Sequence, residues 1–190
     1  MFLFREILFN GFLKLERWIR GKHDIFVVRT TDSVSGLIYD EVNDRVLLIR
    51  QGRAAMVCED NPDGLIVELV AGRFDVNLGT RALLAKESKE EAGVTLDEDS
   101  IVILNGGQPM AISPGFATER CYLAFAVIKS SQVDDHGDTG RGEATEGEDI
   151  TRFWMRAEDF CNSTHEDLRV FTLMQYLTVY RSHRKPRSRE

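Results

Sequence analysis

Three glutamates near the middle of the chain have the side chains and the spacing that metal chemistry requires. Glu87, Glu90 and Glu91 lie at positions i, i+3 and i+4 of the segment 80–92, which lacks Pro and Gly, so a helix there carries all three carboxylates on one face. Like charges at this spacing oppose a helix by roughly 0.2–0.5 kcal/mol per pair, and the helix dipole adds to that cost. Such a run can be a solvated face whose acids are screened by interspersed lysines. A divalent cation is the alternative, because Mg²⁺ takes oxygen ligands and turns the repulsion into coordination.

The segment around these acids resembles the Nudix box of nucleoside-diphosphate hydrolases. That signature reads Gly, five residues, Glu, seven residues, then Arg-Glu-apolar-any-Glu-Glu-any-Gly-apolar. The matching positions are Gly72, Glu87, Glu90, Glu91, Gly93 and Val94. Three positions depart, with Leu78 in place of Glu, Lys86 in place of Arg and Ser88 in place of an apolar residue. Because lysine cannot reproduce the planar, two-pronged grip of arginine on a carboxylate, we expect a neighbouring glutamate to be held less tightly.

Beyond the box, the chain resembles the ADP-ribose pyrophosphatase and nucleotide-sugar hydrolase group of Nudix enzymes over nearly its whole length. The stretches that carry the resemblance are FNGFLKLER at 9–17, IRQGRAA at 49–55, ELVAG at 68–72, SPGFATER at 113–120 and TEGEDI at 145–150. In that group a mobile loop after the longest strand supplies a catalytic glutamate and, two residues later, a metal ligand. On loop statistics alone, the acidic segment 131–149 also fits an ordinary solvated loop.

The resemblance implies a site for two or three Mg²⁺ ions, with Mn²⁺ as a substitute. The implied ligands are the backbone carbonyl of Ala71 and the carboxylates of Glu87, Glu91 and Glu148. Glu146 is the implied general base, because its carboxylate has to orient a water near the bound pyrophosphate. Glu90 is implied to bind or orient from just outside the coordination shell.

The implied reaction cleaves the pyrophosphate bond of a nucleoside diphosphate sugar and yields a nucleoside monophosphate and a sugar phosphate. ADP-ribose is the first candidate substrate, and GDP-mannose or a dinucleotide is the alternative. The residues expected to contact the substrate are Arg53, Glu68, Gly115 and Glu119. A rival from another class is a Nudix-fold sensor that binds a nucleotide without turnover, for which the departures at Leu78 and Lys86 are the support.

Composition indicates an ordinary globular protein that acts on a small molecule. The 24 basic and 31 acidic residues give a net charge of −7, which disfavours binding to nucleic acid or to an anionic membrane. Three widely spaced cysteines fit reduced thiols better than a disulfide framework. The apolar N-terminus is interrupted by charges too early for a targeting segment, and nothing approaches an 18-residue apolar span. We therefore expect a soluble, cytoplasmic protein.

The order of elements predicts an α+β fold. Strands are expected at 25–28, 36–39, 46–49, 65–70, 101–104, 120–128 and 150–155. Helices are expected at 80–92, ended by a left-handed Gly93, and at 157–161 and 168–181. Strands on either side of one central helix, closed by a C-terminal helix, give an α/β/α sandwich with a mixed sheet. We assign the catalytic domain to 36–182 and a basic flexible tail to 183–190.

Residues 1–35 are predicted to form a β arm that joins two copies of the chain. Asn10-Gly11 is a signal for a two-residue hairpin turn between apolar runs, although an amphipathic helix on the surface is the competing interpretation. Phe2, Phe4, Phe9 and Phe12 would leave an apolar patch exposed on a monomer. Enzymes of the Nudix group that this chain resembles look like dimers that exchange their N-terminal arms, so a homodimer is expected.

Overall fold

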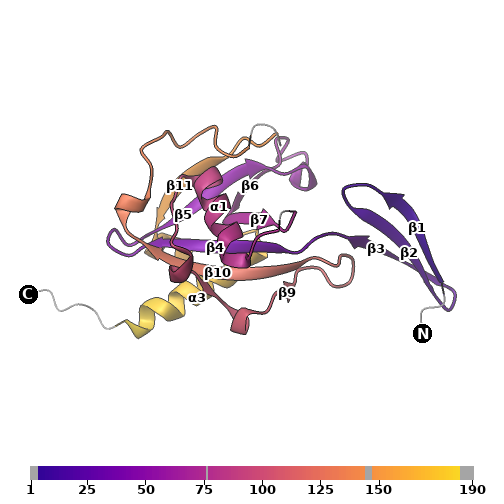
Figure 1. Cartoon of the computed structure of the whole chain (residues 1–190). Coiled ribbons are helices and arrows are strands. Elements are labelled where there is room, and N and C mark those ends of the chain that lie inside the picture. The colour runs from indigo at the N-terminus through magenta and orange to yellow at the C-terminus, as the bar shows by residue number, and fades with distance from the viewer. Residues whose placement is uncertain (1–3, 76, 144–146, 185–190) are drawn as a thin grey trace, which may run out of the picture.

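A mixed sheet of eight strands forms the centre of the molecule, with helices on both of its faces (Figure 1). The structure is a computed structural model, and it describes residues 4–75, 77–143 and 147–184. The predicted α+β class and α/β/α arrangement are confirmed. The site lies where the central helix meets this sheet, so the course of the strands determines which side chains reach it.

The eight strands follow the order β11-β5-β4-β10-β8, with β6 beside β5, β7 beside β4 and β9 beside β10. Their bounds are Ser33–Asp40 (β4), Arg45–Gly52 (β5), Leu65–Glu68 (β6), Val70–Arg73 (β7), Val102–Ile103 (β8), Met110–Ala111 (β9), Arg120–Ile128 (β10) and Thr151–Arg156 (β11). Strands β4 and β10 run parallel, whereas the other neighbours are antiparallel.

One predicted strand is in fact two. The segment 65–70 was expected to be continuous, but Glu68 pairs with Ile49 of β5 whereas Val70 pairs with Gly36 of β4. The chain crosses from one neighbour to the other at Leu69, whose side chain is buried. Because of this crossing, the residue of ELVAG before Leu69 lies beside β5, whereas the residues after it lie beside β4.

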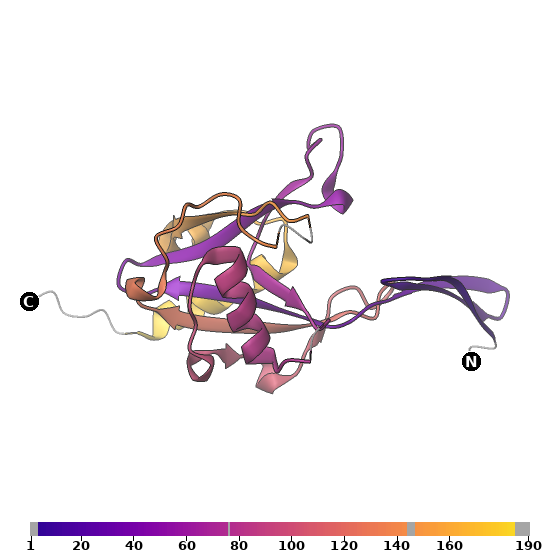
Figure 2. The same cartoon turned by 45° about the horizontal axis from the view of Figure 1, so that its top comes forward.

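Helices cover the two faces of the sheet. In the described part of the chain they are α1 (Thr80–Ala92), α2 (Ala157–Asn162) and α3 (Leu168–His183), and short 3-10 turns lie at Ala54–Met56, Glu98–Ser100, Asn105–Gly107 and Ser130–Gln132. Figures 1 and 2 show α1 on one side of the sheet and α3 on the other. Among the residues that the structure describes, no helix is long and apolar enough to cross a membrane.

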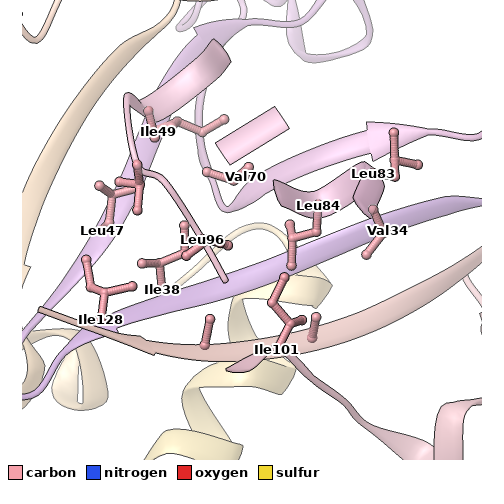
Figure 3. Packing of buried hydrophobic residues seen from close by; sticks show 14 of the residues in the cluster. Val34, Ile38, Leu47, Ile49, Val70, Leu83, Leu84, Leu96, Ile101 and Ile128 are labelled. Atoms are coloured by element: carbon pink, nitrogen blue, oxygen red, sulfur yellow. The ribbon is translucent and has the colours of Figure 1, made fainter. Parts of the chain in front are cut away.

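Helix α1 is fixed by its packing and by its last residue. Leu83 and Leu84 are fully buried against β4, β5 and β7 (Figure 3). A β carbon at Gly36 would lie 2.5 Å from Leu84 Cδ2, so this glycine lets the helix approach the strand closely. Gly93 ends the helix at φ 63°, and the Gly93 and Val94 amides donate back to the Lys89 and Ser88 carbonyls. The predicted bounds and cap are confirmed.

The N-terminal strands form a separate sheet that projects from the body (Figures 1 and 2). Its order is β1 (Phe4–Asn10), β2 (Lys14–Arg20) and β3 (His23–Arg29). The hairpin prediction is confirmed, but its turn has three residues, not two, because Asn10 pairs with Lys14. Phe9 and Phe12 are exposed at 56% and 81%. Phe2 and the side chain of Phe4 lie outside the described residues.

Candidate active site

The first cluster of the site forms where β7 runs beside α1. The Ala71 amide donates to Glu91 Oε2 over 3.1 Å, which ties the carboxylate to the strand. A β carbon at Gly72 would lie only 2.4 Å from Glu87 Cγ. Any larger residue at position 72 would therefore displace Glu87, and this contact is a physical reason for the first glycine of the motif.

Burial makes these carboxylates poor anions in the absence of a cation. Glu91 is only 3% exposed, and burial raises the pKa of its carboxyl well above the usual value, with Glu87 and Glu148 adding to the shift. Burial likewise raises the pKa of Glu87 to about 7 against the opposing charge of Lys86, and the nearby charges of Glu90 and Glu148 add to the rise. Burial and mutual repulsion therefore oppose the ionisation of Glu87 and Glu91.

Glu148 reaches the cluster from the loop before β11. Its Oε2 accepts a hydrogen bond of 3.0 Å from the Glu143 amide. Gly142 lies between this carboxylate and the helix, because its amide approaches the Glu90 carbonyl at 3.3 Å and its absent β carbon would lie 2.7 Å from Glu148 Oε2. The structure thus places the carboxylates of Glu87, Glu91 and Glu148 within electrostatic reach of one another and ties Glu91 to the Ala71 amide, whereas the role of these acids and of the Ala71 carbonyl as ligands stays a prediction. The predicted base, Glu146, lies outside the described residues.

The donor set fits a hard divalent cation. The side chains supply only oxygen atoms, which Mg²⁺ and Mn²⁺ prefer, and a cation would offset the burial and the like charges that raise the pKa of Glu87 and Glu91. Within residues 4–75, 77–143 and 147–184, no three acidic, histidine or cysteine side chains already stand at ligand spacing.

Two of the three departures from the motif have a visible structural role. Lys86 Nζ contacts Glu90 Oε2 at 2.5 Å and Glu87 Oε1 at 3.5 Å, so Glu90 is held by a close ion pair. Ser88 is fully buried, and its hydroxyl donates to the Leu84 carbonyl over 2.6 Å, which satisfies a polar group at a position that faces the core. Leu78, the third departure, is 40% exposed.

A second cluster surrounds the buried carboxylate of Glu68. Its Oε2 accepts from Arg53 Nε at 2.9 Å and from Gln51 Nε2 at 3.0 Å, and its Oε1 accepts from an Arg169 amino group at 2.7 Å. The charge of Arg53 also lowers the pKa of Glu91, which links this cluster to the first. Sequence reasoning missed Arg169, because it lies 101 residues from Glu68 and no local pattern marks it.

The remaining substrate-binding candidates, Glu119 and Gly115, differ in their surroundings. Glu119 Oε1 accepts from the Ser33 hydroxyl at 2.7 Å, and Glu119 and Arg169 both act on the Cys121 thiol, whose pKa is raised by burial. Glu119 therefore lies on the side of the second cluster. Gly115 lies instead on an exposed loop whose next residue, Phe116, accepts from the Val28 amide of β3. Their contacts with substrate stay predictions.

A mixed sheet between helices, with a glycine-backed helix that presents clustered glutamates, is the architecture of a Nudix-type pyrophosphatase. No model of a protein family matches this chain. The chain is 30% identical to the ADP-ribose pyrophosphatase of Haemophilus influenzae over 158 residues, which cover 76% of this chain and 68% of that protein. It is 28% identical to the GDP-mannose pyrophosphatase of Enterobacter sp. over 180 residues, 94% of this chain and 88% of the relative. The GDP-mannose pyrophosphatase of Cronobacter sakazakii is 26% identical over 182 residues, with the same coverage. The chain belongs to the Nudix family of pyrophosphatases.

The raised pKa of Glu91 predicts how the metal-free protein responds to pH. A carboxyl with a folded pKa above its unfolded value of 4.5 lowers stability when ionised, and this loss disappears as the pH falls from the folded to the unfolded pKa. We therefore expect Glu91→Gln, which keeps an acceptor for the Ala71 amide, to raise the melting temperature at pH 8 by about 2–4 °C, the effect of roughly 1 kcal/mol in a domain of this size. The gain should vanish near pH 4.5, and Mg²⁺ should no longer stabilise the variant.

Thermal unfolding in EDTA and in Mg²⁺ checks this expectation, with Glu59→Gln, a change of an exposed acid, as the matched control. A marked loss of metal-free stability in Glu91→Gln would indicate that the carboxylate belongs to a structural ion pair instead.

Proposed function

We propose that this protein hydrolyses the pyrophosphate bond of a nucleoside diphosphate sugar, with Mg²⁺ bound by Ala71 O, Glu87, Glu91 and Glu148. The observation that carries the proposal is the convergence of buried carboxylates with raised pKa values beside the Ala71 backbone. Such a cluster is costly in a protein that binds no cation. The match to named pyrophosphatases over most of the chain supports the same reaction.

Bound Mg²⁺, or Mn²⁺ in its place, would neutralise the pyrophosphate oxygens and lower the pKa of a coordinated water. The protein's own groups then supply orientation and proton transfer. Glu146 is the proposed base that takes a proton from the attacking water, while the bond between phosphorus and the bridging oxygen breaks. Glu90, held by Lys86, orients the neighbouring carboxylates. The products are a nucleoside monophosphate and a sugar phosphate.

Arg53 is the proposed contact to the substrate phosphates. Its guanidinium is 43% exposed, and its Nε donates to the buried carboxylate of Glu68. This bond fixes the orientation of the guanidinium and leaves its two terminal nitrogens for the phosphates. Arg169 holds the second oxygen of Glu68 and thereby supports Arg53. Glu119 and Gly115 are proposed to contact the nucleoside or the sugar.

ADP-ribose and GDP-mannose are the two substrates that we propose. The relative named for ADP-ribose has the higher identity, whereas those named for GDP-mannose match a larger share of the chain. We also propose the cytoplasm as the setting, because the three cysteines are free, as is usual in a reducing compartment.

Incubation with a panel of nucleoside diphosphate sugars and dinucleotides in Mg²⁺, analysed by product mass, tests this function. We expect AMP and ribose phosphate from ADP-ribose or GMP and mannose phosphate from GDP-mannose. Glu146→Gln should lower kcat by roughly 10²–10⁴ with little change in KM, as for loss of a general base. Glu148→Gln should raise the Mg²⁺ requirement as well.

Asp135→Asn is the matched control, because Asp135 is a fully exposed acid of the same loop, and it should behave like the wild type. Tight binding of a nucleotide sugar without any product would contradict hydrolysis and favour the sensor. Normal turnover by Glu146→Gln would remove that residue as the base.

We further propose that the N-terminal sheet, within the arm of residues 1–35, joins two copies of the chain. Its support is the number of large apolar side chains that this small sheet leaves exposed, namely Ile7, Leu8, Phe9, Phe12 and Phe26. A sheet of three strands with so little core gains stability by covering such a surface. A symmetric dimer is the commonest way to do so.

Light scattering should therefore find a dimer at micromolar concentration, and Phe9→Ser combined with Phe26→Ser should shift it to monomer. Val42→Ser, which removes an exposed apolar side chain from the β4–β5 turn, is the control and should remain dimeric. A wild-type monomer would contradict this assembly.

A further inference from the structure

Two buried arginines meet one aspartate at the base of the loop that carries Glu148. Arg141 and Arg152 are only 8% and 5% exposed. An amino group of Arg141 lies 2.6 Å from Asp134 Oδ1, and an amino group of Arg152 lies 3.0 Å from the same oxygen. We call Asp134, Arg141 and Arg152 the arginine clamp. Buried guanidinium groups are costly unless their donors are satisfied, so their remaining partners indicate what the clamp holds.

Arg152 joins the loop to the end of α1. Its Nη1 donates to the carbonyl of Ala92 over 2.7 Å, and Ala92 is the residue after Glu91. Its Nη2 donates to the Asp134 and His136 carbonyls, and its Nε donates to Asp138 Oδ1 over 2.7 Å. With the bond to the Asp134 carboxylate, all five N–H donors of a guanidinium are used. One side chain therefore fixes both the loop backbone and the helix terminus.

Arg141 continues the connection to Glu148. Its side chain donates to the Gly137 and His136 carbonyls, each over 2.9 Å. Its backbone pairs with Ile150 through two hydrogen bonds of 3.0 Å, which closes the loop on the two sides of Glu148. The next residue, Gly142, lies between Glu148 and the Glu90 carbonyl. The position of the Glu148 carboxylate therefore depends on where Arg141 is held.

The clamp also explains the closeness of the loop to the helix. A β carbon at Gly93 would lie 2.1 Å from Asp134 Oδ2 and 2.3 Å from an Arg141 nitrogen. Gly93 thus caps the helix in a left-handed conformation, and its lack of a side chain leaves room for the clamp beside it. The Gly93 carbonyl also accepts from the Asp134 amide over 2.8 Å, so the first residue of the clamp is tied directly to the end of the motif.

We propose that the arginine clamp consists of positioning residues that set Glu148 against Glu87 and Glu91 and thereby determine the affinity for the metal. This inference rests on the proposed role of Glu148 as a ligand. A clamp that served only global stability would not need to connect the helix terminus to the two ends of the Glu148 segment. Lysine cannot replace either arginine, because the three N–H donors of its ammonium group share one nitrogen. They cannot reach the carbonyl oxygens that surround the planar guanidinium group.

The test compares Arg141→Lys with the wild type by titrating Mg²⁺ into the full-length protein without nucleotide. We expect the dissociation constant for Mg²⁺ to rise by about tenfold, and amide exchange in residues 134–143 of the metal-free protein to accelerate, because the fixed geometry of the ligand is lost. With a nucleotide sugar, kcat at limiting Mg²⁺ should fall and recover at high Mg²⁺, with KM little changed. Arg156→Lys, a change of an exposed arginine in the same strand as Arg152, is the matched control.

A double-mutant cycle separates positioning from a structural role. If Arg141 acts through Glu148, Arg141→Lys should change the Mg²⁺ affinity of Glu148→Gln by less than about twofold. Should Arg141→Lys fail to fold, Asp134→Asn, which keeps the size and one acceptor, is measured instead. Unchanged Mg²⁺ affinity with a lowered melting temperature would overturn the proposal, as would a wild type that binds no Mg²⁺. A wild type that binds Mg²⁺ but hydrolyses no nucleotide sugar would overturn the proposed function alone, since the affinity measurement uses no substrate.

Discussion

The buried carboxylate of Glu91 is the constraint on which the rest of the site depends. It is tied to the Ala71 amide and lies close to Glu87 and Glu148, so its ionisation is opposed both by burial and by like charge. Close ion pairs hold Glu90 and Glu68, and Lys86 also lies 3.5 Å from Glu87, yet burial still raises the pKa of both Glu87 and Glu91. A divalent cation resolves this conflict, because it supplies the missing charge and accepts oxygen ligands. The same cation would bring the substrate pyrophosphate to the site.

The fold delivers these acids by close approaches that depend on glycine. Gly36 admits Leu84 and brings α1 onto β4, Gly72 admits Glu87, and Gly93 turns the chain so that the clamp fits beside it. The crossing at Leu69 then divides the neighbouring polar residues into two clusters. Glu68 holds Arg53 in one, and Ala71 holds Glu91 in the other. A metal site and a phosphate contact can thus be built from one short segment.

The sequence was sufficient to predict those features that depend only on residues close together in the chain. The bounds of α1, its Gly93 cap and the bounds of β10 are as predicted, because propensity, capping and alternation are local signals. The division of 65–70 was missed because pairing with β4 or β5 is decided by the sheet. The support of Glu68 by Arg169 and the bond from Arg152 of the clamp to the Ala92 carbonyl were missed for the same reason, since these partners lie 101 and 60 residues apart in the chain. The family resemblance identified the acids but not the side chains that hold them.

The most direct test of this account is the number of protons released when Mg²⁺ binds at pH 7. Calorimetric titration in two buffers with different ionisation enthalpies gives this number without any substrate. Because Glu87 has a pKa of about 7 and that of Glu91 lies well above its usual value, the account predicts that binding displaces about one proton or more. The combined change of both residues to Gln should abolish this release. Binding of Mg²⁺ without proton release would contradict the account, because the cation would then be held by groups other than these buried glutamates.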